Sequence, residues 1–188
     1  LDKVKNYWVK GVLETSLHDR VALELGLESR EDMLDRAWSI VWQSEDASHT
    51  LPTGMKAIDK FDELGAGRTL LILGEPGGGK TTTLLELARD LIGRAKYDIA
   101  LAIPVVFNLS SWSNKQQNLD RWLVSELNSK YQVGKETAKT WVKEQKLLLL
   151  LDGLDEVTLN SREACVDAIN EFCQKYGQTE LVVCSRIR

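Results

Sequence analysis

The chain has 188 residues, a length that suits one domain with a sizeable core, or one domain with a short attachment. Its 24 basic and 28 acidic side chains give a formal net charge of −4, and no block of basic residues stands out. This balance speaks against a non-specific nucleic-acid surface and against a membrane-binding surface. The longest unbroken apolar stretch, Leu147–Leu151, is too short to cross a bilayer.

The ends of the chain suggest how it relates to a longer protein, and its cysteines suggest its redox compartment. The chain begins at Leu1 instead of Met and stops at Arg188, directly after an apolar run, so we expect a piece of a longer protein. Cys165, Cys173 and Cys184 follow no zinc-ligand spacing. We interpret them as buried thiols of a reducing, cytoplasmic compartment.

The front of the chain shows mixed periodicities. Apolar residues recur at helical spacing over Leu1–Leu17, which predicts a helix. Strict alternation over Val21–Leu27 predicts a short strand, and residues 33–43 fit either a helix or a brief strand. The polar stretch Gln43–Gly54 is typical of a linker. We therefore expect residues 1–54 to form a short N-terminal α/β extension that ends in this linker.

The remaining residues, 55–188, are expected to form the core domain, and strands and helices alternate in it from Thr69 onward. A short helix around Phe61 precedes an apolar run over Thr69–Leu73 that is expected to be a buried strand, and the helix after it is expected to end at Gly93. Later strands are expected at Ile103–Leu109, Leu147–Asp152 and Leu181–Cys184, and later helices at Leu119–Tyr131, around Ala138–Val142 and from Asn160 to Gly177. This alternation predicts an α/β fold with a doubly wound parallel sheet, in which the run of five leucines is a central strand.

One motif dominates this core domain. Gly74, Gly79, Lys80 and Thr81 fit the spacing GxxxxGK[ST], between a predicted strand and a predicted helix. Glycines let the backbone curl so that amide groups point at phosphate oxygens, and the helix adds the positive end of its dipole. We expect Lys80 to reach the β- and γ-phosphates and Thr81 to hold Mg²⁺; the alternative is a purely structural Gly-rich turn. The predicted nucleotide-binding residues are Gly74, Glu75, Pro76, Gly77, Gly78, Gly79, Lys80, Thr81 and Thr82.

An acidic cluster follows the run of leucines. Asp152, Asp155 and Glu156 lie within five residues, and their repulsion is costly unless a cation or protons offset it. We predict Asp152 in the Mg²⁺ shell, because a metal ligand is expected at the carboxyl end of a parallel strand. The spacing leaves open which acid activates water, with Glu156 the first choice and Asp155 the second. The alternative is an acidic loop at a helix start.

An arginine follows the last predicted strand at the same edge of the sheet. Arg186 is therefore predicted to sense or stabilise the γ-phosphate. The alternative is a solvated arginine near the end of the chain, because Arg188 comes two residues later.

Four segments together resemble the NACHT group of STAND P-loop NTPases: Gly74–Thr81, Ile103–Trp112, Leu147–Glu156 and Val182–Arg186. The particular mark is a glycine after the Walker B aspartate with an acidic pair beyond it, matched here by the segment from Asp152 to Glu156. The resemblance covers the chain from strand Thr69–Leu73 to Arg186. The front segment resembles the region that precedes this domain in bacterial, especially cyanobacterial, members.

This resemblance implies a nucleotide switch. ADP would hold a closed state, and ATP with a ligand signal on a C-terminal sensor would open it to form homo-oligomers and drive an N-terminal effector. Lys80 and Thr81 match the Walker A pair, and Asp152 matches the acid that binds Mg²⁺. Asp155 and Glu156 match the acidic pair and Arg186 the sensor arginine. The fifth core strand, helical lid, winged-helix domain, sensor and effector of the family are expected outside this fragment.

The leading hypothesis is therefore an ATP-binding, Mg²⁺-dependent NTPase that hydrolyses slowly and acts as a signalling switch. A nucleotide-binding scaffold without significant hydrolysis is the alternative. ATP is the expected nucleotide because Asn114-Lys115-Gln116-Gln117 lacks the Asp of the guanine-reading NKxD motif. GTP stays possible, since no base-reading residue can be named.

Overall fold

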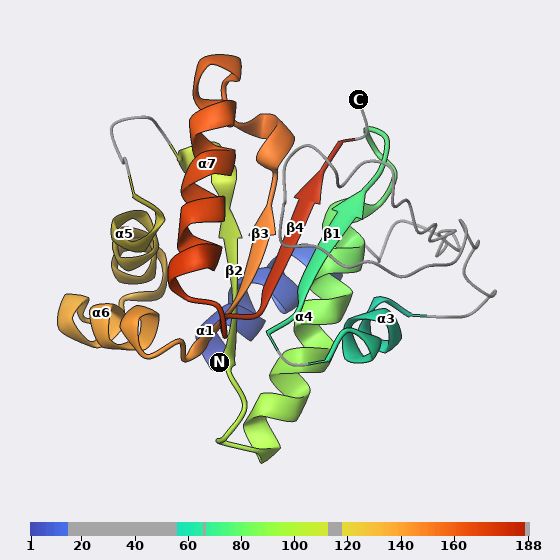
Figure 1. Ribbon diagram of the computed structural model, residues 1–188. Coiled ribbons are helices and arrows are strands. Elements are labelled where there is room, and N and C mark those ends of the chain that lie inside the picture. The colour runs from blue at the N-terminus through green and yellow to red at the C-terminus, as the bar shows by residue number, and fades with distance from the viewer. Residues whose placement is uncertain (15–55, 66, 113–117, 187–188) are drawn as a thin grey trace.

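The computed structural model describes residues 1–14, 56–65, 67–112 and 118–186 (Figure 1). Within them, four parallel strands form one sheet in the order β1-β4-β3-β2. The elements are α1 (Asp2–Val4), η1 (Lys5–Glu14), α3 (Ala57–Glu63), β1 (Thr69–Leu73), α4 (Lys80–Tyr97), β2 (Ile103–Asn108), η2 (Leu109–Ser111), α5 (Leu119–Tyr131), α6 (Lys135–Lys143), β3 (Leu147–Asp152), η3 (Leu154–Glu156), α7 (Leu159–Lys175) and β4 (Leu181–Ser185). The predicted α/β fold with a parallel sheet is confirmed. The strand predicted at 21–27 and the linker at 43–54 lie outside the described residues.

Helices cover both faces of the sheet. Figure 1 shows α4 on one face and α7 on the other. The chain crosses from β1 to β2 at the far edge and returns through β3 to β4, so β4 lies between β1 and β3. The carboxyl ends of the strands therefore gather at one edge, where Leu73 is in register with Ser185 and Asn108 with Asp152. In the described ranges, no helix has both the length and the apolar character needed to cross a membrane.

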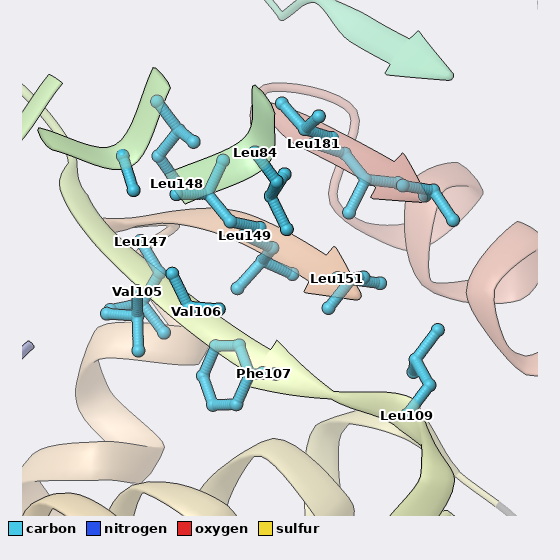
Figure 2. Packing of buried hydrophobic residues seen from close by; sticks show 14 of the residues in the cluster. Leu84, Val105, Val106, Phe107, Leu109, Leu147, Leu148, Leu149, Leu151 and Leu181 are labelled. Atoms are coloured by element: carbon cyan, nitrogen blue, oxygen red, sulfur yellow. The ribbon is translucent and has the colours of Figure 1, made fainter. Parts of the chain in front are cut away.

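The run of leucines forms the centre of the core. β3 pairs with β2 on one side and β4 on the other, and all six of its residues are buried. Figure 2 shows its leucines packed with Val106 and Phe107 of β2, Leu181 of β4 and Leu84 of α4.

β1 differs from the buried strand that was expected. It pairs only with β4 among the described strands, and only Ile72 of its five residues is buried.

Two helix boundaries differ from the sequence prediction. α4 continues through Gly93 to Tyr97, because the turn beyond the glycine has its own contacts: Ala95 is buried and Arg94 forms an ion pair with Asp62. α7 begins at Leu159, one residue before the predicted start. Long-range packing and ion pairing thus override the helix-stop signal that glycine gives locally.

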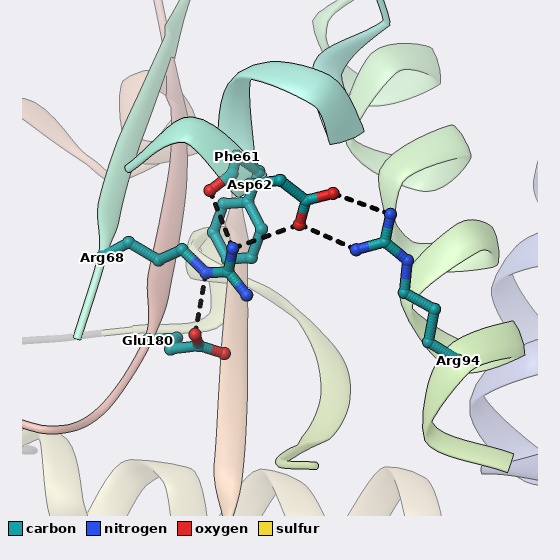
Figure 3. A network of polar contacts seen from close by, with 5 residues as sticks. All are labelled: Phe61, Asp62, Arg68, Arg94 and Glu180. Atoms are coloured by element: carbon teal, nitrogen blue, oxygen red, sulfur yellow. Dashed lines mark hydrogen bonds and ion pairs between the residues drawn. The ribbon is translucent and has the colours of Figure 1, made fainter. Parts of the chain in front are cut away.

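A polar network fastens α3 to α4 and to the amino ends of β1 and β4 (Figure 3). Both terminal nitrogens of Arg94 donate to the carboxylate of Asp62 at 2.7 Å, and this hydrogen bonding lowers the pKa of Asp62. Arg68 donates to Glu180 at 2.8 Å and to the Phe61 carbonyl at 2.9 Å, with its guanidinium 4.0 Å from the Phe61 ring centroid. This network lies at the edge opposite the end of β3 that carries Asp152, so it stabilises the fold away from the predicted site.

The N-terminal helical segment packs into the same core as the sheet. Val4, Trp8 and Val9 are buried in the shared hydrophobic cluster, beside α4. The indole Nε1 of Trp8 donates to the Tyr131 hydroxyl at 2.8 Å, and that hydroxyl donates to the Val106 carbonyl. Burial raises the pKa of Tyr131, so its hydroxyl stays protonated and able to donate. Because β2 lies at the edge of the described sheet, this relay satisfies a carbonyl on its open side.

We expect Trp8→Phe to lower the free energy of unfolding by about 1 to 3 kcal/mol, because it removes a buried hydrogen bond and part of a buried ring. Urea denaturation followed by circular dichroism measures this change. Tyr7→Phe is the matched control, since the Tyr7 side chain is exposed and the change should stay within about 0.5 kcal/mol. Equal effects of the two substitutions would contradict a specific anchoring role for Trp8.

The three cysteines are free thiols, and their burial differs from the prediction at one position. Cys165 and Cys184 are buried, whereas Cys173 is half-buried. Burial raises the pKa of the Cys165 thiol to about 12 and that of Cys173 to about 11. Neither thiol is therefore an activated nucleophile at neutral pH.

Candidate functional site

The loop Gly74–Gly79 joins β1 to α4 at the carboxyl edge of the sheet. Gly77 and Gly79 have φ angles of 75° and 77°, in the left-handed region that favours glycine. A Cβ on Gly78 would lie 3.0 Å from the carbonyl oxygen of Glu75. The glycines thus permit a tightly curled loop that side chains would fill, as a phosphate-binding loop requires.

Lys80 is the first residue of α4, and its side chain lies back along the loop. Its Nζ donates to the carbonyls of Gly74 at 2.8 Å and Glu75 at 2.9 Å. A Cβ on Gly74 would lie 3.2 Å from the Lys80 Cγ. Glycine at this position therefore leaves room for the lysine side chain to lie along the loop. Glu75 and Pro76 are exposed at the tip of the loop, and Thr82 is half-buried in the first turn of α4.

The hydroxyl of Thr81 donates to Oδ2 of Asp152 at 2.9 Å. This bond joins the start of α4 to the end of β3, across the intervening β4. Asp152 is only 7% exposed, and burial raises its pKa, while the hydrogen bonds from Thr81 and the Gly153 amide act in the opposite direction. A bound cation would favour the charged form of such a buried carboxylate.

The acidic pair lies in the single turn η3 that follows β3. Asp155 Oδ2 pairs with Arg186 Nε at 2.5 Å, and the Asp155 side chain is 11% exposed whereas that of Arg186 is 53% exposed. Glu156 is exposed, and within the described residues it forms no ion pair. Gly153 has φ 74°, and a Cβ there would lie 2.9 Å from Glu156 Oε2. The turn therefore requires glycine at 153, while Arg186 offsets part of the charge of the cluster.

Two contacts of this site were not foreseen from the sequence. Arg162, from the first part of α7, donates to the carbonyls of Asp155 and Val157. Cys184 Sγ of β4 lies 3.7 Å from the Lys80 carbonyl oxygen, beneath the start of α4. Neither contact has the short, fixed spacing of a cap or turn motif, so the sequence alone carried no signal for either.

The oxygens of this site suit a nucleotide with a hard divalent cation. A threonine hydroxyl and one buried carboxylate lie together, and oxygen ligands are those that Mg²⁺ prefers. No group of three or more His, Cys, Asp or Glu that could hold a metal occurs among the described residues.

Comparison with known families accounts for this arrangement. Residues 68–187, more than half of the chain, match the family model of the NACHT domain. The match includes the glycine-rich loop, the acidic turn and Arg186. Comparisons with curated proteins and with solved structures returned no match. The chain therefore belongs to the NACHT domain family, and its parallel α/β fold is that of a P-loop nucleoside triphosphatase.

Proposed function

We propose that this NACHT domain binds ATP with Mg²⁺, hydrolyses it slowly to ADP and phosphate, and serves as a nucleotide switch in cytoplasmic signalling. The observation that carries the proposal is the 2.9 Å hydrogen bond between Thr81 and Asp152. It joins a hydroxyl in the first turn of α4 to the buried acid of β3, and such a pair of oxygens supports the proposal of Mg²⁺ bound together with the nucleotide. Gly74 to Thr82 are proposed to hold the phosphates.

Lys80 is proposed to bind the β- and γ-phosphates. Its Nζ now contacts two loop carbonyls, and phosphate oxygens would replace these neutral acceptors with charged ones. The amide groups of the loop and the positive end of α4 would act on the same phosphates. Each of these groups favours an anion in the loop.

Thr81 and Asp152 are the residues proposed to hold Mg²⁺. When bound, the cation supplies charge neutralisation for the phosphates. Asp152 suits this role because it is a buried carboxylate at the end of β3. Its neighbours orient it through the Thr81 hydroxyl and the Gly153 amide.

Glu156 is proposed as the residue that accepts a proton from the attacking water, in preference to Asp155. The Asp155 carboxylate is engaged by Arg186 at 2.5 Å, so a water molecule would have to compete with the arginine for that carboxylate. Glu156 is exposed at the end of η3 and has no such partner among the described residues. The two acids thus differ in environment although they are adjacent in sequence.

Arg186 is proposed to report the γ-phosphate. A guanidinium that is half exposed and paired with one carboxylate can exchange that partner for a phosphate oxygen. ATP offers this competing anion and ADP does not, so the two nucleotides would stabilise different positions of Arg186. This difference is the molecular basis proposed for the switch.

In the full-length protein, we place this switch between an N-terminal effector and a C-terminal sensor. Residues 1–54 are proposed as an extension and linker, and residues 55–188 as the NTPase core. Homo-oligomers are proposed for the ATP-bound state. The support for this larger scheme is membership of the NACHT family, not a contact within this chain.

We expect wild-type protein to bind ATP and ADP saturably, and Thr81→Ala to lower the Mg²⁺-dependent gain in ATP affinity by about 10- to 100-fold, because the cation loses one of its two proposed protein oxygen ligands. Isothermal titration calorimetry with ATP, ADP and GTP, with Mg²⁺ and with EDTA, measures both quantities. Thr81→Ser is the control, since it keeps the hydroxyl. Absence of saturable nucleotide binding by the wild type would refute the proposed function as a whole.

A further inference from the structure

We infer that Arg162 is a positioning residue for Glu156, an inference that rests on the proposed function. Its Nη2 donates to the carbonyl of Asp155 at 2.5 Å and to that of Val157 at 3.1 Å. These two carbonyls stand on either side of Glu156. One nitrogen of one side chain therefore contacts the main-chain carbonyls of the residues directly before and after the proposed base.

The segment that Arg162 holds has little support of its own. η3 is a single turn, closed by the Glu156 amide to the Gly153 carbonyl at 2.9 Å and by the Val157 amide to the Leu154 carbonyl at 3.4 Å. Such an isolated turn is marginal, because fixing its residues costs more than its few hydrogen bonds return. Buried Leu154 and Val157 anchor its two ends, and the two acids lie between them. A polar contact to the carbonyls adds to these anchors and restricts how the segment that carries the acids can turn.

The location of Arg162 is unfavourable for an arginine that only stabilises a helix. It lies near the N-terminus of α7, where the helix dipole disfavours a positive charge. Its Nε is buried without a hydrogen-bond partner among the described residues. Burial of an unpaired donor also costs free energy. Residues that depart from local preferences in this way concentrate at functional sites.

Two arginines hold the acidic turn from different sides. Arg162 of α7 contacts the main chain of Asp155, and Arg186 after β4 pairs with its side chain. Neither the Lys80 contacts nor the Thr81–Asp152 bond involves Arg162. Loss of its guanidinium should therefore disturb the proposed base while leaving the phosphate loop intact.

The test compares Arg162→Gln and Arg162→Lys with wild type. We expect Arg162→Gln to slow single-turnover phosphate release by about 10- to 100-fold, because small displacements of a catalytic group are costly, and to leave the Kd for Mg²⁺-ATP within about twofold. Arg162→Lys keeps the positive charge and a group that can donate hydrogen bonds. Its rate of phosphate release should therefore lie between those of Arg162→Gln and wild type. Arg89→Gln, at a partly exposed arginine on α4, is the matched control and should change neither quantity.

Hydrogen exchange provides a second measurement that does not depend on turnover. Arg162→Gln should speed exchange at the amides of Glu156 and Val157, with exchange in β3 unchanged. If exchange at these amides and phosphate release both match wild type, the inference is wrong. If both Arg162 variants lose thermal stability and ATP binding together, Arg162 is a folding residue and the inference is also wrong. If wild type binds ATP but releases no phosphate, the proposed hydrolysis fails, and exchange alone then decides whether Arg162 positions the turn.

Discussion

Lys80→Ala is expected to weaken ATP binding by about 10- to 100-fold, the loss that corresponds to a charged hydrogen bond of about 1.5 to 3 kcal/mol. Lys80 Nζ already lies over the loop, 2.8 Å from the Gly74 carbonyl oxygen and 2.9 Å from that of Glu75. In the proposed complex this ammonium binds the β- and γ-phosphates. Alanine removes it, yet should preserve α4, since alanine is the best helix former.

The same titration of Lys96→Ala separates this effect from a general loss of positive charge. Lys96 lies in the last turn of α4 and pairs with Asp2 at 2.5 Å, at the opposite end of the helix from the loop. Its removal should leave ATP affinity within about twofold, since charges far apart at the surface are screened by salt. Unchanged affinity in Lys80→Ala, with both variants folded, would assign the glycine-rich loop a structural role only.

The parts of the fold that follow local chemistry could be predicted from the sequence. A run of five leucines can be satisfied only by burial on both faces, so β3 was placed correctly in the middle of a parallel sheet. The glycines of the loop, followed by Lys80 and Thr81, fixed where β1 ends and α4 begins. These signals are strong because each depends on residues that are neighbours in the chain.

The parts that depend on distant partners could not be predicted. Gly93 carries a local helix-stop signal, yet α4 continues beyond it. Arg94, in the turn after the glycine, bonds to Asp62, which lies 32 residues earlier in the chain. Among the described strands β1 lies at the edge of the sheet and β4 lies between β1 and β3, a strand order that hydrophobic patterns do not encode.

The same distinction between local signals and distant contacts applies to the candidate site. The motif residues could be named, whereas the environments that distinguish Asp155 from Glu156 could not. Those environments depend on Arg186 and Arg162, which lie beyond the turn in the chain and reach it only in the folded protein. Spacing therefore identified the acids but left their roles open, and the ion pair supplies the physical reason to prefer Glu156.

Glu156→Gln is expected to lower the rate of single-turnover phosphate release by about 10²- to 10⁴-fold, the range that general base catalysis contributes. Glutamine keeps the size of the side chain but cannot accept the proton. Because Glu156 is exposed and is not among the residues proposed to hold the phosphates or Mg²⁺, the Kd for Mg²⁺-ATP should stay within about twofold. Rapid mixing with labelled ATP, followed by quantification of released phosphate, measures the rate.

Asp155→Asn supplies the decisive comparison, because it alters the neighbouring acid without touching the proposed base. It removes the carboxylate that pairs with Arg186, so the arginine becomes free to bind the γ-phosphate, and ATP should bind more tightly relative to ADP. Its effect on phosphate release should be smaller than that of Glu156→Gln, while Glu163→Gln, at an exposed acid on α7, should have none. The opposite order, with Asp155→Asn inactive and Glu156→Gln active, would make Asp155 the base. The Arg186 ion pair would then be a contact that must open before water can be activated.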